Sequence, residues 1–182
     1  MRLFLSATLL VFAILSAPNS YAAVNRSVSP NRPGGSGPLG LGIMLGDPSG
    51  ISLKYWNSST TAVALGVASS WRDYLEIFVD HDWHFLSVFT GNSPLVPYVG
   101  VGAGLLFDTY DRYSNDYYTN RRSIFLDDNS GSFALSFRIP LGIEFLPRAV
   151  PLGAFIELMP GLIFLPGMHG IVQAAVGARY YF

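Results

Sequence analysis

Apolar and polar residues alternate along most of the chain after residue 38, with the two-residue period of a β-strand. The last eleven residues show the pattern most clearly: every even-numbered residue from Val172 to Phe182 is apolar, whereas the odd-numbered ones include Gln173 and Arg179. Because successive side chains of a strand point to opposite faces, this segment has one apolar face and one mixed face. Its length fits one pass of a tilted strand through a bilayer, which takes about 9–11 residues.

The same alternation predicts eight strands, separated mostly by short intervals rich in Gly, Pro, Asn and Ser, which are typical of turns. The strands are predicted at Leu39–Gly46, Ile51–Asn57, Thr61–Ser69, Tyr74–Val88, Val96–Phe107, Ser132–Leu146, Leu152–Phe164 and Ile171–Phe182. Eight is the smallest common number of strands in bacterial outer-membrane barrels. The pattern therefore predicts an all-β fold, an eight-stranded antiparallel transmembrane β-barrel built as an up-and-down meander.

Pro140 and Pro160 fall well inside predicted strands. Pro140 and Pro160 each lack the N–H group that a strand donates to its neighbour, and a closed barrel has no edge at which a missing donor is harmless. We expect a bulge or an earlier strand end at each of them.

Within each predicted strand, the charged residues occupy alternate positions and so lie on one face of the strand; we call this shared alternation their parity. They and the residues that share their face are Lys54, Glu76, Asp80, Asp82, His84, Arg138, Glu144, Glu157 and Arg179. Because an arginine or lysine on the lipid face near the bilayer centre costs about 2–4 kcal/mol, this parity predicts that the charges face the lumen. An eight-stranded lumen is just wide enough to be filled by side chains, so we expect a salt-bridge network that plugs the barrel and leaves no open pore. Candidate partners of Arg179 are Glu76, Glu144 and Glu157.

Alternation alone does not distinguish this arrangement from a soluble periplasmic barrel with its charges outside. Aromatic residues near the predicted strand ends favour the membrane, because transmembrane barrels carry aromatic girdles at both interfaces. These residues are Tyr55, Trp56, Trp71, Tyr74, Trp83, Phe85, Tyr98, Phe107 and Tyr180.

The N-terminus predicts export. Met1-Arg2 is followed by an apolar run from Leu3 to Ala17 and by small residues at Ser20 and Ala22, which is the pattern of a cleaved signal peptide over residues 1–22. Residues 23–38, rich in Ser, Asn, Pro and Gly, are predicted to form a flexible lead-in to a barrel over 39–182. Removing Arg2 from the 11 basic residues leaves 10 against 12 acidic ones, a formal charge of −2. This charge gives no nucleic-acid-binding signature.

The C-terminus has its own signature. Gly177, Tyr180 and Phe182 resemble the terminal signal by which outer-membrane proteins are recognised for insertion. The expected partners are therefore outer-membrane lipid and, during insertion, the barrel-assembly machinery. We expect a monomer in the bacterial outer membrane.

The sequence contains no set of residues that predicts catalysis, a cofactor or a metal site. His81 and His84 fall on opposite faces of one strand, and His84 lies three residues before Ser87, so the two point to opposite sides. His169 lies in a turn without a nearby serine or acid. A lipid-modifying enzyme and a small channel remain alternatives to a structural or surface-interaction role.

The interval Asp108–Gly131 is the longest connection. It is third in order, so it is predicted to face outward if both termini lie in the periplasm. Tyrosine and arginine are typical contact residues, and the interval is a candidate surface for an extracellular ligand. The candidate contact residues are Tyr110, Arg112, Tyr113, Tyr117, Tyr118, Arg121 and Arg122.

Three stretches carry a resemblance to a family. They are residues 42–56, Ile139–Phe145 together with Phe155–Pro160, and Gly177–Phe182. On these stretches the chain resembles a family of small, uncharacterised eight-stranded outer-membrane barrels and, more distantly, barrels of the OmpA/OmpX type. The resemblance implies a fold and a location, and it brings no activity or catalytic residues with it.

Overall fold

The computed structural model describes residues 37–89, 93–109 and 133–182, and these residues form an all-β fold. Its strands are β1 (Leu39–Asp47), β2 (Ser49–Trp56), β3 (Thr61–Ser70), β4 (Tyr74–His84), β5 (Leu95–Asp108), β6 (Phe133–Arg138), β7 (Leu141–Phe145), β8 (Leu152–Leu165) and β9 (His169–Tyr181). Within the described part of the chain, no helix is long and apolar enough to cross a membrane.

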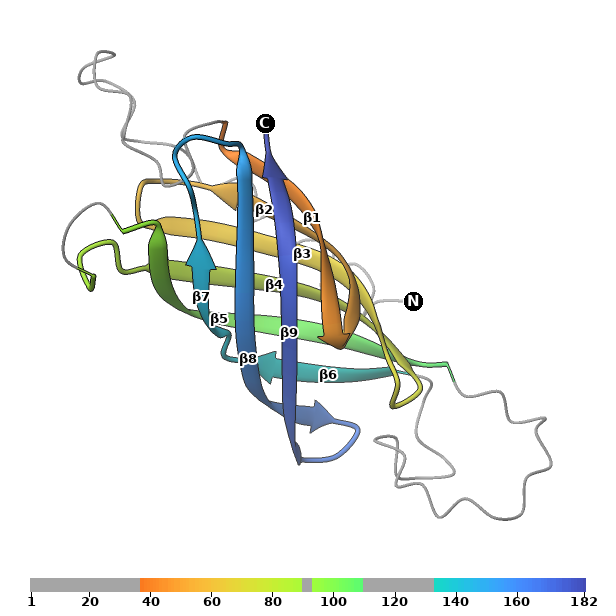
Figure 1. Cartoon of the computed structure of the whole chain (residues 1–182). Coiled ribbons are helices and arrows are strands. Elements are labelled where there is room, and N and C mark those ends of the chain that lie inside the picture. Colours follow the sequence, from red (N-terminus) through yellow and green to blue (C-terminus); the bar gives the residue numbers. More distant parts are fainter. Residues whose placement is uncertain (1–36, 90–92, 110–132) are drawn as a thin grey trace, which may run out of the picture.

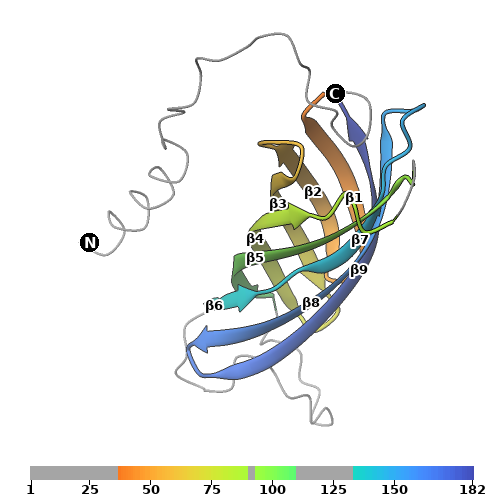
Figure 2. The ribbon, with the colours of Figure 1, turned by 90° about the vertical axis from the view of Figure 1, so that its left-hand side faces the viewer.

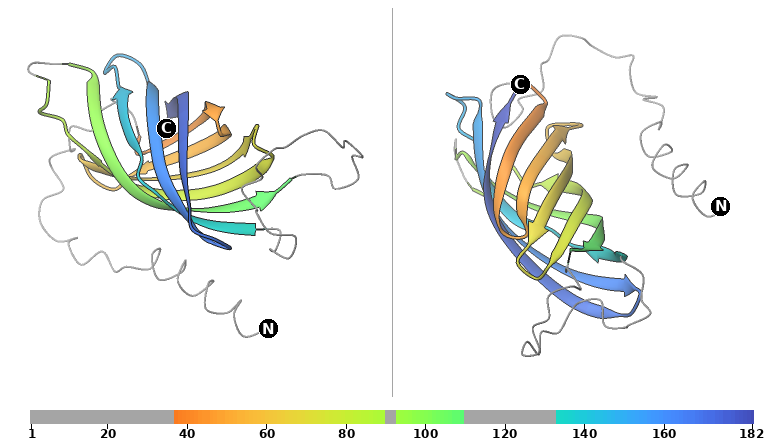
Figure 3. Two further views of the ribbon diagram at one scale, coloured as in Figure 1. Left: turned by 90° about the horizontal axis from the view of Figure 1, so that it is seen from below. Right: turned by 90° about the vertical axis from the view of Figure 1, so that its right-hand side faces the viewer.

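The strands form a closed antiparallel ring. Consecutive strands pair from β1 to β5 and from β8 to β9, and β6 and β7 each pair with β5 and β8. The ring closes where β9 pairs with β1, for example Tyr180 with Leu41. Figure 1 shows this meander, and the other views show the strands curving around a common interior (Figures 2 and 3). The predicted all-β antiparallel fold is confirmed.

β6 and β7 together occupy one position in the ring, between β5 and β8. Both pair with β5 on one side and with β8 on the other, and the register with each neighbour is the same before and after the interruption. The break lies at Ile139–Pro140, as expected for a proline without an N–H donor. The Pro140 carbonyl still accepts from Gly100 N at 2.7 Å, so the two halves remain one wall strand. The nine described strands therefore fill eight strand positions of the barrel wall.

Pro160 behaves differently from Pro140. It lies within β8 without ending it, and its carbonyl accepts from Ile139 N at 2.9 Å. The irregularity of β8 is at Phe164, where the register with β6 shifts. The bulge or strand end expected at Pro160 is therefore wrong, because the irregularity of β8 lies at Phe164 instead.

β4 ends at His84, four residues before the predicted Val88. The next pair in the register would be Phe85 with Pro97, and Phe85 N does donate to the Pro97 carbonyl at 2.9 Å. Pro97 has no N–H to return, so the ladder stops there. Residues 85–89 consequently leave the wall.

The two ends of the barrel differ in what they carry. One end, here called the terminus end, holds Gly37, Phe182 and the β2–β3, β4–β5 and β7–β8 connections. The opposite end, here called the loop end, holds the β1–β2, β3–β4 and β8–β9 connections and the points at which the chain leaves β5 and enters β6 (Figure 1).

Candidate functional site in the barrel interior

The structure places the nine predicted lumen residues inside the barrel. Each is between 0 and 7% exposed. They lie on β2 (Lys54), β4 (Glu76, Asp80, Asp82, His84), β6 (Arg138), β7 (Glu144), β8 (Glu157) and β9 (Arg179). Because strand side chains alternate, one parity in each strand delivers all of them to the same interior.

One group of these residues gathers around Lys54, toward the terminus end. Lys54 Nζ lies 2.9 Å from Glu144 Oε2, 3.2 Å from Asp82 Oδ2 and 3.0 Å from His84 Nε2. Arg179 Nη1 approaches the other oxygen of Glu144 at 3.3 Å. We call Lys54, Asp82, His84, Glu144 and Arg179 the Lys54 cluster, in which two cations face two carboxylates.

A second group surrounds Arg138, nearer the loop end. Arg138 lies 3.0 Å from Glu76, 3.1 Å from Asp80 and 3.6 Å from Glu157. We call these four residues the Arg138 cluster, in which one cation faces three carboxylates. Glu76 and Glu157 are therefore partners of Arg138, and of the three candidates for Arg179 only Glu144 has a salt bridge to it in the described structure.

Neutral polar side chains complete both clusters, and sequence analysis missed them. Ser52 Oγ accepts from Arg179 Nε and Nη2 at 3.1 and 2.9 Å, and Tyr181 donates to Glu144 at 2.5 Å. Gln173 donates to Glu76, and the Tyr98 hydroxyl donates to Glu157. All four have the inward parity, so parity applied to uncharged residues would have found them.

Aromatic rings lie against all three cations. Lys54 Nζ is 4.4 Å from the ring centre of Tyr98, and the guanidinium carbons of Arg138 and Arg179 are 4.2 and 3.8 Å from those of Phe78 and Phe155. A cation over an aromatic face is stabilised by the ring quadrupole, most strongly where water is excluded. Tyr98 contacts a residue of each cluster, because its hydroxyl reaches Glu157 while its ring faces Lys54.

Glycines of β5 make room for the carboxylates of β4. Gly100 and Gly102 pair across the strands with Asp82 and Asp80. A Cβ atom added at Gly102 would lie 1.9 Å from Asp80 Oδ1, and one added at Gly100 would lie 2.5 Å from Asp82 Oδ1. The alternating glycines at 100, 102 and 104 are thus part of the site, and their inward parity was the signal in the sequence.

A cluster of buried, mostly apolar residues lies toward each end of the interior. At the terminus end, Trp56, Ala62, Val96, Leu146 and Tyr181 form one buried cluster. At the loop end, another buried cluster consists of Tyr74, Leu106, Ala134, Ile163 and Ile171. The charged clusters lie between these two apolar layers.

For three of the aromatic residues predicted to lie in the interfacial girdles, the prediction is wrong. Trp56, Tyr74 and Tyr98 are buried in the interior, because they share the parity of the lumen charges. The exposed members of the predicted set are Tyr55, Trp71, Trp83, Phe85 and Tyr180, and Phe107 is half-buried.

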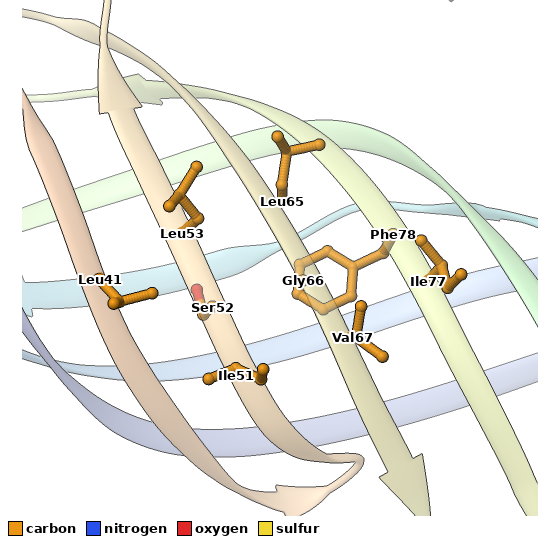
Figure 4. A pocket seen from close by; sticks show the side chains of 9 residues that line it. All are labelled: Leu41, Ile51, Ser52, Leu53, Leu65, Gly66, Val67, Ile77 and Phe78. Carbon is orange, nitrogen blue, oxygen red and sulfur yellow. The ribbon is translucent and has the colours of Figure 1, made fainter.

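The outer wall is apolar. Leu41, Ile43, Val79, Ile156 and Val176 are among its large exposed side chains, and no Asp, Glu, Lys or Arg of a described strand is exposed. A shallow groove of about 240 Å³ crosses this wall between β2 and β3, lined by aliphatic side chains on either side of Gly66 (Figure 4). The wall therefore has the inverse of the polarity of a water-soluble protein surface.

The histidines and the predicted terminal signal also have defined places. His84 contacts Lys54, whereas Ser87 lies outside the wall, and within residues 37–89, 93–109 and 133–182 no three His, Asp or Glu side chains are grouped to hold a metal ion. Tyr180 and Phe182 point outward with ring centres 4.9 Å apart. Gly177 faces inward, over the Phe155 ring. The predicted surface-binding residues from Tyr110 to Arg122 and the predicted signal peptide lie outside the described residues.

Comparison with known proteins supports the fold. No family model matches the chain, and no curated protein matches it in sequence. The structure is similar to the crystal structure of the N-terminal β-barrel domain of Pseudomonas aeruginosa OprF, with a TM-score of 0.54 and 18% sequence identity over 79% of this chain and 95% of that one. At this identity the similarity is one of fold.

Proposed function

We propose that the protein is a bacterial outer-membrane β-barrel with a closed lumen and a structural or surface-interaction role. The observation that carries this proposal is the inverted polarity of the barrel. Lys54, Arg138 and Arg179 are 0, 1 and 3% exposed, whereas the outward faces of the same strands carry aliphatic and aromatic side chains.

The alternative of a soluble barrel requires the opposite orientation. In water the three cations would lie outside and the aliphatic residues would form the core, because burying apolar surface drives folding. Transmembrane barrels instead present an apolar band flanked by aromatic residues at both interfaces. Here Trp71, Phe133 and Phe164 are exposed toward the loop end, and Tyr55, Trp83 and Tyr180 toward the terminus end. The predicted signal peptide and the barrel fold shared with the OprF domain add to this support.

The lumen is proposed to be plugged. Each cation lies within 3.3 Å of a carboxylate, and apolar layers cover the charges at both ends. Paired charges between apolar clusters support a lumen without a continuous polar path for ions. A structural role follows more directly from this interior than transport does.

Two measurements test the proposal. The protein should partition with outer membranes and migrate faster in gels before heating than after it, and a soluble, heat-insensitive protein would contradict the membrane assignment. Purified protein in planar bilayers should show no large single-channel conductance, and a large conductance would contradict the plugged lumen.

A further inference from the structure

The connection between β4 and β5 exposes apolar side chains at the terminus end. Phe85, Leu86, Val88 and Phe89 are 46, 40, 58 and 40% exposed, and Ser87 is the one polar residue among them. We call residues 85–89 the apolar connection. A contiguous exposed apolar segment marks a surface that contacts a membrane or another protein.

Backbone hydrogen bonds fix the region that carries the apolar connection. At its start, His84 N donates to Thr60 O at 2.7 Å and Phe85 N donates to Pro97 O at 2.9 Å. Farther along the β4–β5 connection, Pro94 O accepts from Leu146 N at 2.7 Å. The start of the apolar connection is therefore held beside β5, and Pro94 joins the end of the β4–β5 connection to the start of the β7–β8 connection.

The apolar connection continues the outer wall without a polar break. Trp83, two residues earlier, points outward with 40% exposure. Leu95 and Phe145 form a cross-strand pair at the terminus end of β5 and β7, and their side chains are similarly exposed, at 40 and 42%. The wall and the connection thus form one apolar surface.

Another connection at the same end has the opposite character. The β2–β3 connection is Asn57-Ser58-Ser59-Thr60, and its Ser58 hydroxyl accepts from the backbone N of Thr61 at 3.0 Å. It satisfies its own polar groups in the manner of a solvated turn. The apolar character therefore belongs to the β4–β5 connection and is not general to the terminus end.

We propose that the apolar connection inserts into the headgroup–acyl boundary of the phospholipid leaflet at the terminus end. This inference rests on the proposed membrane-spanning function. Interfacial segments bury apolar side chains about 5–10 Å into that boundary. Continuity with the lipid-facing wall favours lipid over a protein partner.

Site-directed spin labelling tests the proposal directly, because the chain contains no cysteine. Nitroxides are attached to single cysteines in V88C, in T60C on the polar connection, and in V176C on the outer wall. The full mature protein is reconstituted in phosphatidylethanolamine–phosphatidylglycerol vesicles. Collision rates are measured with oxygen, which concentrates in the bilayer, and with a water-soluble nickel chelate.

The label at residue 88 is expected to favour oxygen over the chelate, like that at 176, whereas the label at 60 favours the chelate. The substitutions L86S and F89S should move the ratio at 88 toward the value at 60. A label at 88 that matches 60 in the unmodified connection overturns the proposal. So does a label at 88 that is shielded from both probes in native outer membranes, since a protein partner then covers it. An aqueous signal at 176 would instead contradict the membrane-spanning function itself.

Discussion

The two charged clusters of the interior both pair buried cations with carboxylates, but their ratios of cations to carboxylates differ. In the Lys54 cluster, Lys54 and Arg179 share Glu144, and Asp82 adds the second carboxylate. In the Arg138 cluster, one guanidinium lies within 3.6 Å of three carboxylates. If one cation is removed, the Lys54 cluster still contains a second cation, whereas the Arg138 cluster contains none. The clusters should therefore respond unequally to removal of a cation.

The largest effect is expected from R138M. The substitution leaves the buried carboxylates of Glu76, Asp80 and Glu157 together without their cation. Removing one partner of a buried ion pair costs about 3–5 kcal/mol. Urea unfolding of the protein in detergent micelles would measure the free energy of unfolding. Adding E76Q to R138M should recover part of the loss, because it removes one of the uncompensated charges. An unchanged stability in R138M would show that the cluster is solvated.

A smaller loss is expected from K54M, about 3 kcal/mol at the low end of the same range. Glu144 keeps Arg179 at 3.3 Å, so only Asp82 loses its cation. The comparison of K54M with R138M under identical unfolding conditions is the decisive measurement. Equal losses in the two variants would contradict the idea that Arg179 provides a reserve.

The glycines opposite the carboxylates give the next effect. In G102A the new methyl group would meet Asp80 Oδ1 and the backbone oxygen of Val79, so we expect a loss of about 1–3 kcal/mol from overpacking. G170A is the matched control, because nothing lies within 4 Å of a Cβ at that position. The difference in urea midpoint between the two variants measures the effect, and equal midpoints would mean that the β4–β5 contact relaxes freely.

Much of this arrangement follows from parity. Alternation in the sequence predicted which side chains face inward, and the structure has Lys54, Arg138 and Arg179 on that face. Parity also applies to Trp56, Tyr74 and Tyr98, and the girdle prediction went wrong because it used proximity to strand ends instead. The early end of β4 depends on Pro97 of the neighbouring strand, which no local pattern in β4 contains.

The partners within each cluster could not be predicted in the same way. Arg138 and Glu76 are 62 residues apart and lie on β6 and β4, with β5 between them. Their contact depends on register and on the space left by the glycines of β5, not on either segment alone. Arg179 pairs with Glu144, and Arg138 pairs with Glu76. These pairings depend on which strands the closed ring brings face to face across the interior.

The smallest effect is expected from S52A, which tests the neutral part of the Lys54 cluster. Ser52 Oγ accepts two hydrogen bonds from Arg179, at 3.1 and 2.9 Å, and removing it leaves those donors without that acceptor. Because Glu144 still holds the guanidinium, we expect a loss of about 1 kcal/mol in the free energy of unfolding. In a K54M background the same substitution should cost more, since Arg179 is then the remaining cation beside Glu144. Strict additivity of S52A and K54M would show that Ser52 does not support this reserve role of Arg179.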